Sequence, residues 1–100
     1  MTDTYSKISV VIPAYRVADQ ILNVLSKIGK EVNSIYVVDD DCPEKTGLII
    51  KNYCEDDRVK VITHCVNKGV GGATLTGIHA ALAEGAELIV KVDGDGQMDP

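Results

Sequence analysis

The run Ile8 to Ile12 (ISVVI), closed by Pro13, decides the fold of this 100-residue chain. A short, continuous run of β-branched residues is typical of a strand that is buried on both faces of a parallel sheet. Similar runs follow at Ser34 to Val38 (SIYVV), Val59 to Thr63 (VKVIT) and Leu88 to Val92 (LIVKV). We therefore predict that these four runs are the strands of one sheet.

Helices are expected in the three intervals between these runs, because apolar residues recur there at the spacing of one helical face. These positions are Ile21, Leu22, Leu25 and Ile28 in the first interval, Leu48, Ile49, Ile50 and Tyr53 in the second, and Leu75, Ile78 and Leu82 in the third. The first helix is expected to end near Gly29, and the third to run from Ala73 to Ala83 after a glycine-rich turn over 67–72. The order β-α-β-α-β-α-β predicts a three-layer α/β/α fold with a mostly parallel sheet and right-handed crossovers.

Composition excludes several classes of protein. Lys and Arg total 10 against 15 Asp and Glu, which gives a net charge of −5 and argues against nucleic acid as a partner. Three Cys without a CxxC pair suggest neither a disulfide framework nor a zinc site, so we expect reduced thiols and a cytoplasmic location. The N-terminus lacks the pattern of a secretory signal, and no apolar stretch approaches the ~20 residues of a membrane span.

Ligands of open parallel sheets bind outside the carboxyl ends of the strands, and the chemically informative residues of this chain fall there. The last predicted strand is followed by Asp93-Gly94-Asp95, in which two carboxylates two positions apart share a face. Gln97 adds a neutral oxygen. Mg²⁺ or Mn²⁺ prefers such oxygen ligands and completes its shell with water and phosphates. The alternative is a solvated loop whose Asp residues cap turns.

The other strand ends leave alternatives open. At least one of the three Asp at 39–41 is expected to accept hydrogen bonds from a ligand. The alternative is that one of them caps the next helix and the others face water. Tyr15 could stack under a nucleobase or cover the sheet edge. The NKGVGG turn (67–72) is either a phosphate cradle or a close-packed start of a helix. His64 and His79 stand alone in the sequence and receive no role.

Four segments together resemble glycosyltransferase family 2, whose members have the GT-A fold. They are VVIPAYR (10–16), VVDDDCPEKT (37–46), NKGVGGATLTGIHAA (67–81) and VKVDGDGQMDP (90–100). Within the family, the DDDSPD-T and DADxQ patterns of the dolichyl- and polyprenyl-phosphate sugar transferases are the most similar. The resemblance implies a GDP- or UDP-linked sugar donor, inverting transfer, Mg²⁺ or Mn²⁺, and a lipid phosphate as acceptor. It also implies that the full-length protein acts at the cytoplasmic face of a membrane.

The resemblance assigns a role to each matching residue. Pro13, Ala14 and Tyr15 would line the pocket for the base and ribose, and Val38 and Asp40 would complete the contacts with the base. Asp93 and Gly94 would face the ribose and the sugar phosphate, whereas Asp95 and Gln97 would bind the metal. Asp93 and Asp95 are the residues to which catalysis is assigned.

The chain departs from the family pattern at two places. Arg16-Val17 stands where the family usually has Asn-Glu, and Val70 and Leu75 stand where it often has Lys and Arg. Residues 1–100 are expected to be the N-terminal, donor-binding part of a domain that continues past Pro100, and inactive alone.

Three alternatives remain. One is a family member that binds a nucleotide without catalysis. The second is a receiver-like module phosphorylated at its acidic strand ends. The third is half of a dinucleotide-binding oxidoreductase, although Thr74 occupies the position of its third glycine.

Overall fold

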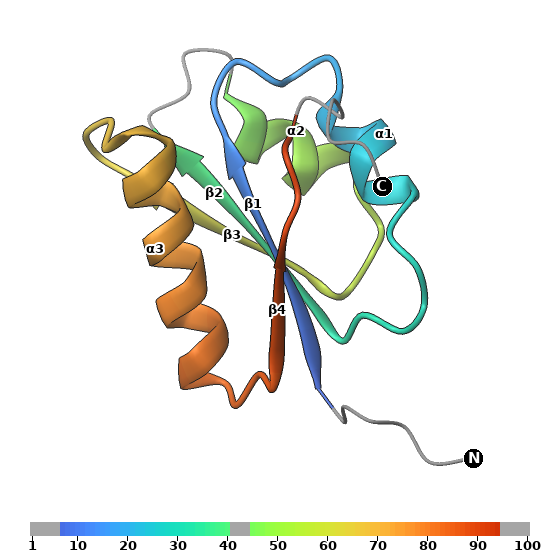
Figure 1. Ribbon diagram of the computed structural model, residues 1–100. Helices are drawn as coiled ribbons and strands as arrows, with labels where there is room; N and C mark the ends of the chain where they lie inside the picture. Colours follow the sequence, from blue (N-terminus) through green and yellow to red (C-terminus); the bar gives the residue numbers. More distant parts are fainter. Residues whose placement is uncertain (1–6, 41–44, 95–100) are drawn as a thin grey trace.

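The computed structural model describes residues 7–40 and 45–94, which form a single four-stranded sheet flanked by helices (Figure 1). The elements follow in the order β1 (Ile8–Ala14), α1 (Ile21–Ser26), β2 (Ser34–Asp40), α2 (Thr46–Tyr53), β3 (Val59–His64), α3 (Gly69–Ala83) and β4 (Leu88–Lys91). All neighbouring strands are parallel, and their order across the sheet is β3-β2-β1-β4. The predicted α/β fold with a parallel sheet is therefore confirmed.

Helices cover both faces of the sheet, which gives the predicted three layers. α1 and α2 lie together on one face, and α3 lies along β1 and β2 on the other (Figure 1). The larger core is on the α1–α2 face, where β-branched residues of the sheet meet the apolar sides of the two helices. Its buried members are Val10, Ile12, Ala14, Val17, Ile21, Val24, Leu25, Val32, Ile35, Val37 and Ile50.

α3 packs on the sheet through small residues. Ala73, Gly77 and Ala81 are its buried positions, one helical turn apart, and a Cβ at Gly77 would overlap the side chain of Val11. The prediction that Leu75, Ile78 and Leu82 form the buried face was wrong, because Leu75 and Leu82 are each more than half exposed. The small residues bring the helix so close to β1 that no room is left for a leucine between them.

Boundaries also differ from the predicted ones. β1 continues through Pro13 to Ala14, and α3 begins at Gly69, four residues before Ala73. Proline is tolerated in β1 because Val11, two positions earlier, directs its carbonyl toward β4, so the missing N–H of Pro13 also faces that side. The β1–β4 ladder ends at Val11. The proline therefore removes no ladder hydrogen bond.

α2 buries fewer of its apolar side chains than the sequence predicts. Thr46 and Ile50 are its buried residues, whereas Leu48 and Tyr53, which were expected on the buried face, are exposed. A helix of two turns at the margin of the sheet covers only β2 and β3 with one narrow side. No helix within 7–40 and 45–94 has the length and apolar character needed to cross a membrane.

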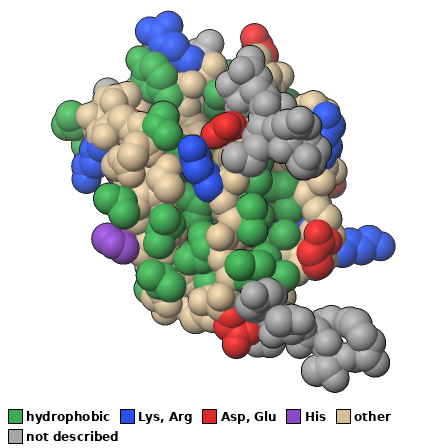
Figure 2. All heavy atoms as spheres, in the orientation of Figure 1, with side chains coloured by type: hydrophobic (Ala, Val, Ile, Leu, Met, Phe, Trp, Pro, Cys, Tyr) green, Lys and Arg blue, Asp and Glu red, His purple; other side chains and the backbone are tan. Residues whose placement is uncertain are grey.

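The outer side of β4 has no strand beside it among the described residues. A hollow of about 520 Å³ lies there between β4 and α1, and Ile8, Val10, Val24, Leu88 and Val90 supply apolar side chains to it. Figure 2 shows hydrophobic side chains gathered around the centre of this face of the molecule.

Candidate functional site

A second hollow, of about 510 Å³, lies at the carboxyl ends of the strands. It is lined by Pro13, Ala14, Tyr15, Val17, Asp40, Asn67, Gly69, Val70, Ala73, Asp93 and Gly94. The chain moves outward from β1 to β2 and β3, and then crosses back to place β4 on the other side of β1. Such a reversal of strand order opens a crevice at which α/β proteins bind ligands. The hollow therefore lies where the fold itself predicts a binding site.

Six of the predicted donor-binding residues line this one cavity. They are Pro13, Ala14, Tyr15, Asp40, Asp93 and Gly94, which come from the ends of β1, β2 and β4. Val38, which is buried in β2, is not among the residues that line the cavity. The predicted metal ligands Asp95 and Gln97 lie outside the described residues, as do Asp41 and Glu44.

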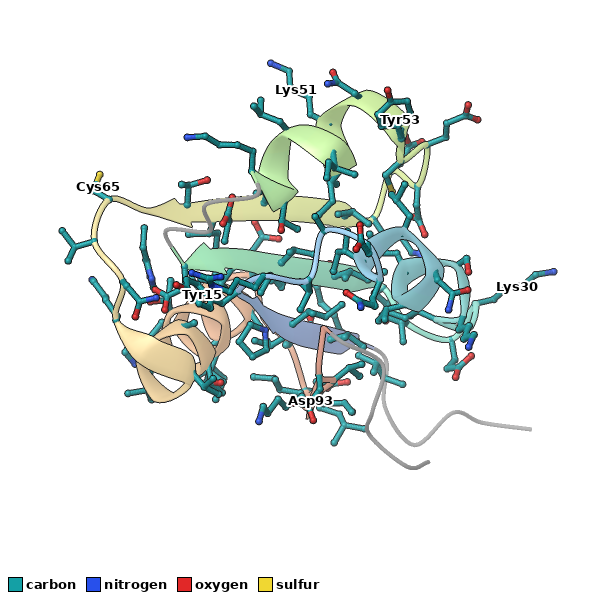
Figure 3. All side chains as sticks on the ribbon, turned by 90° about the horizontal axis from the view of Figure 1, so that it is seen from above. Tyr15, Lys30, Lys51, Tyr53, Cys65 and Asp93 are labelled. Atoms are coloured by element: carbon teal, nitrogen blue, oxygen red, sulfur yellow. The ribbon has the colours of Figure 1, made fainter. Side chains whose placement is uncertain are left out.

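The end of β1 packs directly against the segment that follows β4. A Cβ at Gly94 would lie 3.3 Å from the carbonyl oxygen of Pro13 and 3.2 Å from Val17 Cγ2, so only a residue without a side chain fits comfortably. Tyr15 is 41% exposed at this end, and the Arg16 guanidinium lies 5.3 Å from the centre of its ring. Figure 3 shows Tyr15 at the end of β1 and Asp93 beyond β4.

The two described Asp of the β2 end serve different purposes. Asp39 Oδ2 accepts a hydrogen bond of 3.1 Å from the backbone N–H of Gly47, in the first turn of α2. This is the helix-capping alternative, since a carboxylate satisfies a free N–H and suits the positive end of the helix dipole. Asp40 points to the opposite face of the sheet, where it lines the cavity. Both carboxylates are buried.

Asp40 is held by donors from two segments. Its Oδ1 accepts hydrogen bonds from His64 Nδ1 at 2.7 Å and from the backbone N–H of Lys68 at 2.8 Å. Burial raises the pKa of the Asp40 carboxyl, but hydrogen bonds from His64 and from the N–H groups of Lys68 and Gly69 lower it more. The net pKa lies below the ordinary value, and the side chain is a carboxylate at neutral pH.

Sequence reasoning missed His64 and Asn67. His64 is the last residue of β3 and stands beside Asp40 in the β2–β3 register. The signal was present, since both residues end neighbouring parallel strands, but they are 24 positions apart in the chain. Asn67 Nδ2 donates to the backbone oxygen of Asp40, and Asn67 Oδ1 accepts from the N–H of Gly69. Asn67 thereby ties the start of α3 to the end of β2.

The NKGVGG turn is the beginning of α3 rather than a separate loop. Gly69 has a positive φ of 78°, which glycine adopts without strain, and it lines the cavity together with Val70 and Ala73. The turn is therefore the start of a helix, but without the close packing expected there, because nothing lies within 4 Å of a Cβ added at Gly69 or Gly71. The side chain of Val70 is exposed and apolar, so it supplies no cation to a phosphate at this position.

The β4 end is more open than the β2 end. Asp93 Oδ1 lies 3.4 Å from Lys91 Nζ, and both side chains are about 40% exposed. Among residues 7–40 and 45–94, no three acidic, histidine or cysteine side chains gather closely enough to hold a metal ion. Asp93 is the described carboxylate that a divalent ion could reach at this edge of the cavity. Its oxygen chemistry suits Mg²⁺ or Mn²⁺.

Of the positions that depart from the family pattern, Val17 and Val70 line the cavity. Val17 is 6% exposed, belongs to the main core and contributes apolar surface to the cavity. A glutamate in its place would bring a carboxylate to that wall. The wall at Val17 is therefore neutral, whereas Asp40 and Asp93 line other sides of the cavity.

Comparison with known proteins defines the family. Residues 9–100 match the model of glycosyl transferase family 2, so the chain belongs to this family and its fold is the GT-A fold. It is 39% identical over 94% of its length to the uncharacterized protein MJ1222 of Methanocaldococcus jannaschii. It is 36% identical over 93% of its length to the UDP-N-acetylglucosamine–dolichyl-phosphate N-acetylglucosaminyltransferase of Methanococcus voltae.

A solved structure gives the same result. The chain superimposes on residues 1–349 of S. aureus TarS in complex with UDP with a TM-score of 0.71, at 27% identity over 89% of the chain. The aligned part is 27% of that TarS chain, 37% of the M. jannaschii protein and 43% of the M. voltae enzyme. The present chain thus spans less than half the length of each.

Proposed function

We propose that the protein containing this chain transfers a sugar from a nucleotide-diphosphate donor to a polyprenyl phosphate. One observation carries the proposal: residues from the ends of β1, β2 and β4 that the family pattern assigns to the donor line one cavity at the switch point of the sheet. The acceptor is taken from the relatives, because the M. voltae enzyme is named for a dolichyl-phosphate acceptor.

The base is assigned to the Asp40 side of the cavity. An ionised carboxylate accepts hydrogen bonds and cannot donate them, so it suits the N3–H of uracil or the N1–H and amino group of guanine. Tyr15 offers an exposed ring on which the base can stack. The UDP bound to TarS and the UDP-linked substrate in the name of the M. voltae enzyme favour uridine over guanosine.

The diphosphate is assigned to the opposite side, near Asp93 and Gly94. We assign Asp93, Asp95 and Gln97 to a Mg²⁺ or Mn²⁺ ion, which when bound offsets the charge of the departing nucleotide diphosphate. An oxygen of the acceptor phosphate attacks the anomeric carbon from the face opposite the donor phosphate, and the bond to that phosphate breaks. The configuration at that carbon is then inverted. A lipid phosphate is already anionic, so this attack requires no general base.

The first test is calorimetric titration of UDP and GDP into the full-length protein, with and without Mn²⁺. Metal-dependent binding of one of them establishes the donor site and selects the base. Transfer to a polyprenyl phosphate is then measured with the wild-type protein and with Asp95→Ala. Loss of metal-dependent turnover in the variant is the expected result, and undiminished turnover in Asp95→Ala contradicts the assignment of this residue.

One observation favours a second function. The neutral wall at Val17, where the family usually carries Glu, removes a polar contact with the nucleotide and suits a member that binds without catalysis. In that case UDP or GDP binds to the full-length protein, but no sugar is transferred to any lipid phosphate offered. Replacing Val17 by Glu tests whether the missing contact limits the affinity for the donor.

A further inference from the structure

A buried chain of polar side chains connects the cavity to the middle of α3. Asp40 Oδ1 lies 2.7 Å from His64 Nδ1, and His64 Nε2 lies 2.8 Å from Thr76 Oγ1. Thr76 Oγ1 in turn donates to the backbone oxygen of Gly72 at 3.1 Å. The side chains of His64 and Asp40 are 6% and 3% exposed, so these contacts are shielded from water.

The contacts fix the proton on one of the two imidazole nitrogens. The Thr76 hydroxyl lies within hydrogen-bond distance of both His64 Nε2 and the Gly72 carbonyl oxygen. The Asp40 carboxylate has no proton to give, so His64 Nδ1–H is the donor in their contact. His64 Nδ1–H therefore donates to the buried Asp40 carboxylate, and Nε2 meets the Thr76 hydroxyl.

We propose that His64 is a positioning residue for recognition of the nucleobase, an inference that rests on the donor site proposed above. The imidazole and the Lys68 N–H both donate to Oδ1 of Asp40, which anchors this oxygen of the carboxylate at the wall of the cavity. The paired histidine also keeps Asp40 in the form that only accepts hydrogen bonds. His64 acts through Asp40, because it does not itself line the cavity.

The state of Asp40 determines which nucleobases the cavity accepts. Uracil and guanine present a ring N–H to a carboxylate, whereas cytosine and adenine present an unprotonated ring nitrogen at the equivalent edge. Two acceptors facing each other repel, so a fixed, ionised Asp40 selects against cytosine and adenine. A carboxylate that was free to rotate or to take up a proton would discriminate less, because a carboxylic acid can donate to those nitrogens.

Two substitutions of the same residue separate the contacts of the imidazole. In His64→Asn the amide NH₂ reaches the position of Nδ1 and keeps a donor for Asp40. In His64→Gln it reaches the position of Nε2 and keeps the contact with Thr76 but leaves Asp40 without this donor. His79→Gln is the matched control, since His79 lies on the exposed side of α3 and does not line the cavity.

The experiment is calorimetric titration of UDP, GDP, CDP and ADP into the full-length wild-type protein and the three variants, each checked for folding by circular dichroism. We expect His64→Gln to bind the preferred nucleotide about tenfold more weakly, as for a lost hydrogen bond to a charged group. Its preference over CDP and ADP should narrow by a similar factor. His64→Asn should restore most of the affinity and preference, and His79→Gln should match the wild type.

Other results overturn the inference. Unchanged affinity and base preference in His64→Gln would show that Asp40 recognises the base without the hydrogen bond from His64. Equal weakening of all four nucleotides, or no recovery in His64→Asn, would show that His64 only supports the fold. Failure of the wild-type protein to bind any of the four nucleotides would remove the proposed donor site, and the inference with it.

Discussion

The two acidic strand ends of the cavity differ in how the protein treats their charges. At the end of β2, Asp39 and Asp40 lie within the strand and are 6% and 2% exposed. Each accepts a hydrogen bond from a backbone N–H, of Gly47 and Lys68 respectively. At the end of β4, Asp93 lies two residues beyond the strand and is about 40% exposed, with Lys91 at 3.4 Å.

The position of each strand in the sheet explains the difference. β2 has neighbours on both sides, and its pairing extends to Asp39 with β1 and to Asp40 with β3. Among the described residues, β4 pairs with β1 alone, over four residues, and so lies at the edge of this part of the sheet. A carboxylate deep in the sheet must be satisfied by protein donors, whereas one at an edge remains accessible to water and ligands. The cavity therefore has a fixed side at β2 and an open side at β4.

Replacing Asp40 by Ala is the strongest test of this comparison. The substitution leaves the buried His64 and the Lys68 N–H without their acceptor, so we expect the free energy of unfolding to fall by about 3 kcal/mol. Asp93→Ala removes only a half-exposed pair and should change it by less than about 0.5 kcal/mol. Urea denaturation of both variants measures the difference. Similar losses in the two would abolish the distinction between a fixed and an open side.

The close packing of α3 on β1 supports the fixed side of the cavity, at the end of β2. A methyl group at Gly77 would overlap Val11, so Gly77→Ala should lower the free energy of unfolding by about 1–3 kcal/mol. The matched variant Gly71→Ala lies in the same helix with nothing within 4 Å of its new methyl, and it should be neutral or more stable by up to about 1 kcal/mol. In Gly77→Ala, the displaced α3 should also move Thr76 away from His64.

If Gly77→Ala is as stable as Gly71→Ala in urea denaturation, the close approach of α3 does not constrain this side of the cavity. In that case Thr76 would also be free to keep its contact with His64.

The strands and their order along the chain could be predicted because each is a compact β-branched run, a local signal. The buried face of α3 could not be predicted in this way. Leu75 and Leu82 have the apolar character expected of a core, but Gly77 brings the helix so close to Val11 that small residues take the inner positions. Hydrophobicity indicates which residues can be buried, and the distance between layers decides which of them are.

The candidate site shows the same limit. Tyr15, Asp40 and Asp93 could be chosen because each follows a predicted strand directly. His64 also ends a strand, but its partners Asp40 and Thr76 are brought to it by strand register and helix packing, which no local spacing contains. Val38 was predicted to contact the base, but it is not among the residues that line the cavity.

The depressed pKa of Asp40 predicts a pH dependence of stability. Burial opposes ionisation, but hydrogen bonds from His64, Lys68 and Gly69 outweigh it, so the folded protein holds the carboxylate more strongly than the unfolded chain. This contribution is complete above the ordinary Asp pKa of about 3.9 and is lost as the pH falls through the lower folded value. Below about pH 4, the wild-type protein should therefore lose stability more steeply than Asp40→Asn.

Two other carboxyls contribute in the same window, because hydrogen bonds from Arg58 lower the pKa of Asp56 and those from Lys60 and Tyr36 lower the pKa of Glu84. The comparison is therefore made in an Asp56→Asn, Glu84→Gln background, by urea denaturation at a series of pH values between about 2 and 6. Parallel pH profiles with and without Asp40→Asn would show that the β2 end does not favour the ionised carboxylate.

The smallest effect is expected at the open side, from Lys91→Gln. The pair with Asp93 is about 40% exposed on both partners, so its loss should change the free energy of unfolding by less than about 0.5 kcal/mol. Removal of the cation leaves the Asp93 charge to a divalent ion, and Mn²⁺-dependent binding of UDP should strengthen by up to about fivefold. Lys51→Gln, on the exposed side of α2, is the matched control (Figure 3). A stability loss comparable to that of Asp40→Ala would mean that Lys91 holds the β4 end as firmly as His64 holds the β2 end. Both sides of the cavity would then be fixed before a ligand binds.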